Sequence, residues 1–304
     1  PAVRNVMLSV TRSLTVEKDF DAQCSAAPST AQLKARNAEF FMVGSDRLAL
    51  VSSAEDEDEE GGMGGTVGSS VYVWITSTND WDEQYRVEEE EMDEVWVVDS
   101  RRFYVGTGTK IRPCSISRDF YSGATEIKVE DPLSFDFTVE HIVLATDTDY
   151  LFLITATDIH MYYGNTQRAT CALHAGYGGR PLLGLGASVY FIVNSNATYV
   201  DEFDTSTNEW YRVSLGVEEG VPYPVLKTAA DEATVYSAEL MAVFALANDG
   251  ALWMLDALVW RWQRVGAIPN INAESILSCD GRVLYVEEET GDGDDDGITV
   301  AITV

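Results

Sequence analysis

One hairpin-like pattern occurs twice in this sequence, about 130 residues apart. The segment Phe203–Leu215 reads FDTSTNEWYRVSL, and the segment Val73–Val87 reads VWITSTNDWDEQYRV. In each, a strand-like run leads into a Ser-Thr-Asn turn, which is followed by a Trp and then by Arg-Val. Side chains of Ser, Thr, Asn and Asp hydrogen-bond to nearby backbone, so this composition favours a turn between two strands. A chain that forms the same hairpin at two distant places is expected to consist of repeated β units.

A weaker repeat extends over the whole chain. Six segments begin with a small or polar turn and continue into a mostly apolar strand: GSDRLALVSS from Gly44, DSRRFYVGTG from Asp99, DTDYLFLIT from Asp147, GASVYFIVN from Gly186, SAELMAVFAL from Ser237 and CDGRVLYVE from Cys279. Their strand starts lie roughly 40 to 55 residues apart, which is the period of a four-stranded propeller blade. A further apolar run precedes each of them, as expected for strands buried between neighbouring blades.

A hairpin follows in most of these units, and it supplies the two outer strands of a blade. In the best example, Tyr199, Asp201 and Phe203 alternate with the period of two that a half-buried strand shows. The aromatic residue after the turn is expected to pack on the outer face of its own blade. We assign this role to Trp81, Trp210 and Trp260.

The two ends of the chain are expected to meet in the last blade. The final unit, from Ser275, contains only three strand-like runs before the chain stops at Val304. The N-terminal run VRNVMLSVTR reads as a strand without a blade of its own. Pairing it there would complete the last blade and remove an open sheet edge. The sequence therefore predicts an all-β fold, a six-bladed β-propeller that occupies residues 1–304 as a single domain.

The repeated hairpin resembles the kelch-type blade, in which an Asp-x-x-Thr-x-x-Trp hairpin forms the outer strands. Asp204, Thr207 and Trp210 match this spacing, whereas the glycine pair typical of kelch second strands is absent. In architecture and in its irregular blades, the chain also resembles the propellers inside tail nozzle proteins of short-tailed phages. The first resemblance implies a protein-interaction module, and the second implies a structural component of a virion.

The charge of the chain restricts its partners. Fifty acidic residues stand against 20 basic ones, and the formal net charge is −30. Because nucleic acid binding requires cations that displace counterions, a nucleic acid partner is not expected. Anionic membranes are disfavoured for the same reason, and no run of about 18 apolar residues predicts membrane insertion. The acidic, Lys-poor composition indicates either solubility by self-repulsion or a halophilic, high-salt origin.

The sequence contains no recognisable catalytic pattern. His141, His160 and His174 do not have the spacing of a zinc site, and the glycine-rich runs lack the spacing of a phosphate-binding loop. The four cysteines are scattered, which favours buried free thiols over a disulfide framework. We therefore expect no enzyme activity.

One acidic stretch carries a possible metal signature. TGDGDDDGITV places Asp292, Asp294 and Asp296 at alternate positions before a Gly, like the first half of a calcium loop. The second half is missing, because Thr303 stands where the loop would have a Glu. A similar half-motif begins at Asp56. Two interpretations stay open: a solvated acidic hairpin loop, or a site for a cation such as Ca²⁺.

Taken together, these features favour a non-catalytic scaffold that binds other proteins of a larger assembly. A component of a virion or phage tail is the first interpretation, with a virion or cytoplasmic location because no signal peptide is visible. A cellular kelch-like adaptor is the second. A propeller enzyme or carbohydrate-binding protein is the third, since fold alone does not determine function.

Overall fold

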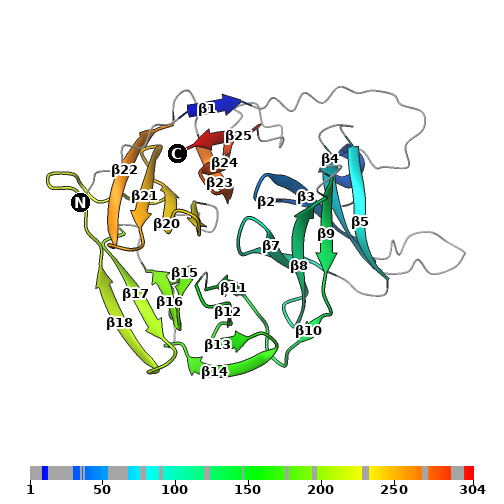
Figure 1. The fold of residues 1–304 in the computed structure, drawn as a ribbon, viewed down its shortest axis with the longest axis horizontal. Helices are drawn as coiled ribbons and strands as arrows, with labels where there is room; N and C mark the ends of the chain where they lie inside the picture. Colours follow the sequence, from blue (N-terminus) through cyan, green and yellow to red (C-terminus); the bar gives the residue numbers. More distant parts are fainter. Residues whose placement is uncertain are drawn as a thin grey trace, which may run out of the picture. The chain divides into compact units, whose positions relative to one another are not determined.

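The chain is an all-β protein with the fold of a six-bladed β-propeller, as the sequence predicts (Figure 1). The structure is a computed structural model that describes residues 9–12, 30–34, 36, 38–53, 68–75, 80–88, 92–119, 124–145, 147–174, 177, 179–193, 197–227, 233–268, 273–288 and 298–304. Within these residues, six antiparallel sheets follow one another along the chain, and the one helix is α1 (Thr30–Lys34). No helix in these ranges is long and apolar enough to cross a membrane.

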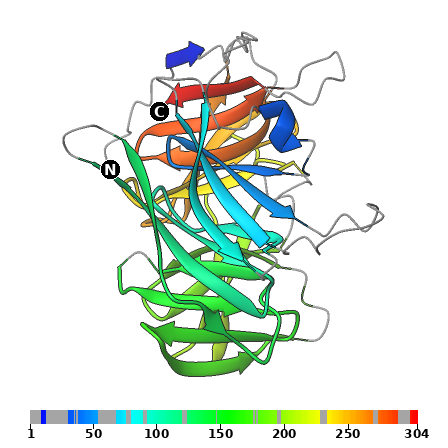
Figure 2. The same cartoon turned by 90° about the vertical axis from the view of Figure 1, so that its right-hand side faces the viewer.

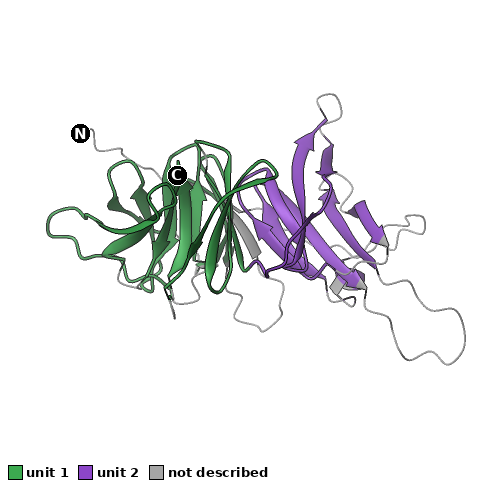
Figure 3. Ribbon diagram, turned by 90° about the horizontal axis from the view of Figure 1, so that it is seen from below, with its two compact units in different colours: residues 1–16, 140–304 green, residues 17–139 purple. Residues whose placement is uncertain are grey.

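The chain divides into two compact units, which are coloured separately in Figure 3. The first comprises residues 1–16 and 140–304 and contains four sheets. Their strands, from the innermost to the outermost, are β11 (His141–Leu144), β12 (Tyr150–Ile154), β13 (Asp158–Tyr163) and β14 (Thr166–Ala172); β15 (Arg180–Leu185), β16 (Ser188–Ile192), β17 (Tyr199–Asp204) and β18 (Glu209–Ser214); β19 (Thr234–Ser237), β20 (Ala242–Leu246), β21 (Ala251–Asp256) and β22 (Arg261–Ala267); and β23 (Ala273–Asp280), β24 (Val283–Glu288), β25 (Ile298–Thr303) and β1 (Ser9–Arg12).

The second unit comprises residues 17–139 and contains two sheets. Its strands are β2 (Glu39–Val43), β3 (Asp46–Ser53), β4 (Gly68–Ile75) and β5 (Asp80–Glu88); and β6 (Glu94–Val97), β7 (Arg102–Gly106), β8 (Lys110–Arg118), β9 (Thr125–Val129) and β10 (Leu133–Ser134). In the second of these sheets, both β9 and β10 pair with β8. The outer edge is therefore divided between two short strands, and Pro132, which has no N–H to donate to a ladder, lies between them.

The N-terminal strand closes the last sheet, which confirms the predicted closure. Strand β1 pairs antiparallel with β25, with Ser9 opposite Thr303 and Arg12 opposite Val300. The fourth strand of this sheet thus comes from the opposite end of the chain (Figure 1). This pairing covers the edge of β25 from Val300 to Thr303.

The hydrophobic core lies between neighbouring sheets of each unit. Strands β16 and β20 are buried at every position, because both of their faces pack against other sheets. Val189 and Phe191 of β16 point into one cluster, while Tyr190 and Ile192 belong to the next. In the second unit, Leu33 of α1 packs into the cluster around Trp81. Helix α1 lies beside the β2–β5 sheet (Figure 2). The second strands of the repeat therefore form the packed layer that the sequence pattern predicts.

Candidate functional site

The turn of the β17–β18 hairpin is held by its first residue. Asp204 Oδ1 accepts hydrogen bonds from the backbone N of Ser206 at 2.8 Å and from its hydroxyl at 2.6 Å. These bonds, with smaller contributions from Thr207, lower the pKa of the Asp204 carboxyl below its usual value. Asn208 has a φ of 58° and donates its backbone N–H to Asp204 O at 2.9 Å. The kelch-like Asp and Thr thus build the turn themselves.

The turn of the β21–β22 hairpin has the same plan. Asp256 Oδ1 accepts the backbone N–H of Leu258 at 2.9 Å, and Trp260 has a φ of 52°. The second residue of each turn also donates its backbone N–H to the turn between the two inner strands of its own sheet. Thr205 N bonds to Ala187 O, and Ala257 N bonds to Met241 O, each at 3.0 Å. Trp260 therefore occupies the left-handed turn position that Asn208 occupies in the other hairpin.

This geometry corrects the predicted role of Trp260. The register pairs Phe203 with Trp210, Trp74 with Trp81 and Leu255 with Trp262. Trp262, not Trp260, is therefore the aromatic residue that follows the turn in the β21–β22 hairpin. Trp260 is partly buried, and its ring lies 4.6 Å from the ring of Tyr190, between centroids.

The three equivalent tryptophans pack more widely than on their own outer face. Trp81 is fully buried and donates its indole N–H to Thr30 Oγ1 at 3.0 Å. Trp262 is 1% exposed and donates to Ala197 O of the preceding sheet at 2.9 Å. Trp210 is partly buried, and it contacts Phe203 of its own sheet as well as Tyr177, which follows the preceding sheet. Trp210 and Trp262 thus join neighbouring sheets, whereas Trp81 joins its own sheet to α1.

The tip of the β21–β22 hairpin is apolar and exposed. Leu258 is 66% exposed and Val259 is 65% exposed; we call these two residues the apolar tip. The equivalent residues of the β17–β18 hairpin are Ser206 and Thr207. Two adjacent aliphatic side chains at a hairpin tip make no favourable interaction with water. Contiguous exposed apolar groups are typical of interaction surfaces.

A cleft of about 870 Å³ lies at the opposite end of the same sheet, where the connection from β18 to β19 passes the β20–β21 turn. The connection is attached at both ends. Gly216 N donates to Trp260 O at 2.8 Å and Gly216 O accepts from Trp262 N at 2.7 Å, while Val225 O accepts from Asn248 N at 2.8 Å. Tyr223 also donates its hydroxyl to Leu215 O at 2.6 Å. The cleft is formed where the connection arches between these attachments.

The walls of the cleft are apolar, and its polar groups are few. Its lining comprises Gly220, Val221, Pro222, Tyr223, Pro224, Val225, Ala247, Asn248, Asp249, Trp253 and Arg264. Trp253 is 3% exposed, and its Nε1–H is a buried donor with no hydrogen-bond acceptor among the residues that the structure describes. Asp249 and Arg264 form an ion pair at 3.5 Å, and both side chains are about half exposed. Such an exposed pair contributes little to stability.

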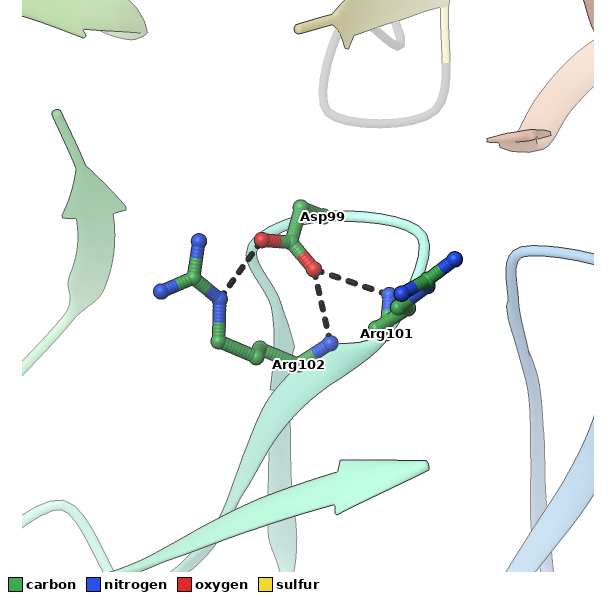
Figure 4. A network of polar contacts seen from close by, with 3 residues as sticks. All are labelled: Asp99, Arg101 and Arg102. Atoms are coloured by element: carbon green, nitrogen blue, oxygen red, sulfur yellow. Dashed lines mark hydrogen bonds and ion pairs between the residues drawn. The ribbon is translucent and has the colours of Figure 1, made fainter. Parts of the chain in front are cut away.

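Turn carboxylates in the second unit have a structural role as well. Asp99 Oδ1 accepts the backbone N–H groups of Arg101 at 2.8 Å and Arg102 at 2.7 Å (Figure 4). Asp99 Oδ2 accepts from Arg102 Nε at 2.7 Å. All of these bonds lie within the β6–β7 turn, so this carboxylate stabilises the turn in the way that short acidic side chains commonly do.

Two carboxyl groups on innermost strands have perturbed titration. Burial, followed by the nearby charges of Glu94 and Asp93, raises the pKa of Glu39. Burial and Asp93 likewise raise the pKa of Glu94. Groups with shifted pKa values occur at functional sites and also in structural clusters. Within the described part of the chain, no group of three or more His, Cys, Asp or Glu residues could hold a metal ion.

The residues singled out by sequence for chemistry are dispersed. His141 begins β11, His160 is buried in β13, and His174 lies beside the ring of Trp210 at 5.5 Å. Cys114, Cys171 and Cys279 are buried free thiols. Asp292, Asp294 and Asp296 lie outside the described residues, as does the half-motif from Asp56, so the calcium loop stays a prediction.

Sequence reasoning missed both features of the β19–β22 sheet that stand out here. The apolar tip could have been found from the sequence, because Asp256 precedes Trp262 by the same interval that separates Asp204 from Trp210. Aligning the two turns on that interval places Leu258 and Val259 at their exposed centre. The cleft had no comparable signal, since the connection that forms it follows no period.

The comparisons with known proteins are limited to overall fold. No family model matches the chain, and no curated protein matches it. Among solved structures, the chain is similar to the crystal structure of Sqt1 from Chaetomium thermophilum, with 8% sequence identity and a TM-score of 0.44. The match covers 83% of this chain and 82% of that one.

Proposed function

We propose that this protein is a non-catalytic scaffold that binds other proteins of a larger assembly. The observation that carries the proposal is the apolar tip, Leu258 and Val259, on a turn whose backbone is otherwise stabilised by Asp256. The propeller fold is compatible with this role, because it presents several turns and loops on a rigid framework.

The residue that follows the apolar tip strengthens the proposal. Trp260 has a left-handed backbone conformation, which is an outlier for a bulky side chain and is commonly associated with function. The same position is filled in the β17–β18 hairpin by Asn208, a residue that tolerates this conformation. The sequence Leu-Val-Trp thus departs from a well-suited turn in the direction of apolar contact area, which is what a partner surface requires.

Within this class, a structural component of a virion or phage tail is the more specific proposal. It is supported by the acidic, Lys-poor composition and by the irregular blades, and the charge disfavours a nucleic acid partner. A cellular kelch-like adaptor is supported by the Asp204, Thr207 and Trp210 pattern. An enzyme or carbohydrate-binding protein would require clustered polar groups beyond the Glu39–Glu94 carboxyls.

The test is a double variant that transfers the polar tip of one hairpin to the other, Leu258→Ser with Val259→Thr. Both side chains are mostly exposed, so we expect stability to change by no more than about 0.5 kcal/mol. In the native source, we expect the wild-type protein to sediment with a high-mass assembly and the double variant to shift to the free fraction.

The matched control is Val97→Ser, which removes an aliphatic side chain that is 40% exposed on β6. It should leave assembly unchanged. If wild type and the double variant sediment alike, whether both free or both assembled, the apolar tip is not a partner surface and the proposal loses its basis.

A further inference from the structure

The outer wall of the cleft is held in place at several points. Pro222 and Pro224 fix the backbone on either side of Tyr223, and Tyr223 is tied by its hydroxyl to Leu215 O. The connection is also bonded to the sheet at Gly216 and at Val225. A wall held in this way loses little conformational entropy when a ligand binds, which favours affinity.

The inner wall contains a hydrogen-bond donor without a partner in the described part of the chain. Trp253 lies in the middle of β21 and lines the cleft, and no described residue accepts a hydrogen bond from its buried Nε1–H. The other buried indoles named above, those of Trp81 and Trp262, donate to protein oxygens. Buried donors are almost always paired in native proteins, so an unpaired donor beside a cleft indicates an acceptor that comes from outside. A main-chain carbonyl of a bound segment supplies such an acceptor.

The charges around the cleft favour a basic ligand. Asp249 is on its rim, and Glu218 and Glu219 directly precede the lining residue Gly220. Arg264 is the one cationic lining residue and is loosely paired with Asp249. The chain as a whole has a formal net charge of −30. A field of this sign increases the association rate of cationic partners and repels anionic ones.

From these three observations, we propose that the cleft binds an extended, positively charged segment of a partner protein, with one apolar side chain between Tyr223, Pro224 and Trp253 and a main-chain carbonyl on Trp253 Nε1. This inference rests on the proposed scaffold function, and it specifies the partner's chemistry at a second place on the same sheet. Lys or Arg side chains beside the anchor would face the acidic rim.

The test uses a displayed library of random peptides, selected on the whole protein. We expect enrichment of sequences in which an aliphatic or aromatic residue stands next to Lys or Arg. A synthetic peptide of the enriched consensus should bind wild type with an affinity that falls as salt is raised. The variant Trp253→Phe keeps an aromatic ring and removes the donor, and we expect it to weaken the peptide about fivefold to tenfold.

Three further variants make the result decisive. Val225→Arg adds bulk and positive charge to a rim residue that is 45% exposed, so it should abolish peptide binding without disturbing the core. Its control, Val97→Arg, changes a valine of similar exposure on β6 and should bind the peptide as wild type does. Trp262→Phe removes a satisfied indole donor and should lower stability while leaving peptide affinity unchanged.

Several outcomes would overturn the inference: no enrichment, enrichment of acidic or uncharged sequences, or equal peptide affinity for wild type, Trp253→Phe and Val225→Arg. These outcomes are distinguishable from failure of the scaffold function, since the sedimentation test uses only the apolar tip. A tip variant that leaves the assembly while still binding the peptide would separate the two surfaces.

Discussion

The β17–β18 and β21–β22 hairpins share one backbone plan and differ almost completely in the side chains of their turns. Both begin with an Asp that accepts a backbone N–H two residues on, and both place a left-handed residue fifth. In both, the second residue donates its backbone N–H to a turn of the same sheet, and a Trp follows two residues after the left-handed position. Between these fixed points, Thr-Ser-Thr-Asn in one becomes Ala-Leu-Val-Trp in the other.

The comparison separates the residues that build the turn from those that are free to serve another purpose. The Asp at the start of the turn and the Trp after it, Trp210 or Trp262, contact their own protein, and both occur in each hairpin. Ser206 and Leu258 occupy the same position, and both hairpins form the shared bonds with the backbone N–H of this residue and not with its side chain. The β21–β22 turn has apolar residues where the β17–β18 turn has polar ones, and it therefore exposes more apolar surface. Packing within the protein does not explain this difference, whereas contact with a partner would.

The largest expected effect concerns the tryptophans that both hairpins share. Trp262 is almost fully buried and hydrogen-bonded, whereas Trp210 is only partly buried. Replacing a buried Trp by Ala typically costs about 3–5 kcal/mol through lost burial and the cavity that remains. We therefore expect Trp262→Ala to lower the free energy of unfolding by this amount, and Trp210→Ala by less, in denaturant titrations.

The Phe variants serve as controls for size. Trp210→Phe should be mild, because Trp210 contributes mainly ring contacts, whereas Trp262→Phe also leaves the carbonyl of Ala197 without its donor. If Trp210→Ala were as costly as Trp262→Ala, the ranking drawn from burial would be wrong.

A smaller effect is expected at the first residue of each turn. Asp204 accepts two bonds from Ser206, while Asp256 accepts one backbone bond from Leu258. We expect Asp204→Ala to cost about 1 kcal/mol and Asp256→Ala to cost less, since each net hydrogen bond contributes about 0.5–1.5 kcal/mol. Chemical denaturation at neutral pH measures both.

The pH dependence of the Asp204 effect follows from its lowered pKa. Because the folded-state pKa lies below the usual value of 3.8, the ionised carboxylate stabilises the folded state above that pH. This stabilisation is lost as the pH falls through the folded-state pKa. The stability difference between wild type and Asp204→Asn should therefore be present at neutral pH and shrink in acid. A difference that grew on acidification would contradict the assigned bonds.

Much of the fold was predictable because its determinants are local. The second strands, such as β16 and β20, can be recognised as continuous runs of apolar residues because both of their faces are buried. The repeated hairpin can be recognised because Asp204 and its neighbours form hydrogen bonds with one another within a few residues. The closure by β1 followed from counting strands in the last unit.

The features that sequence did not reveal depend on tertiary placement. The choice between Trp260 and Trp262 depends on strand register, since residues one and three places after the turn centre differ in environment. The cleft requires the β18–β19 connection to bond to a turn that follows more than 20 residues later, as between Val225 and Asn248. The two-part outer edge of the β6–β10 sheet also interrupts the repeat. The calcium prediction and the single-domain prediction for residues 1–304 stay predictions.

The smallest expected effect is at Trp260, where the cost of a left-handed backbone opposes the gain from a ring contact. Trp260→Asn introduces the residue that the other hairpin has at this position and should relieve about 1–2 kcal/mol of left-handed backbone cost. It also removes the aromatic contact with Tyr190, which is worth about 0.5–1.5 kcal/mol beyond burial. We expect these terms nearly to cancel, so that the denaturant midpoint stays within about 1 kcal/mol of wild type. A loss above about 2 kcal/mol would mean that packing on Tyr190 alone explains the Trp. A near-neutral result would mean that Trp260 contributes little to the stability of the protein. This is expected if Trp260 belongs with Leu258 and Val259 to the surface that a partner covers.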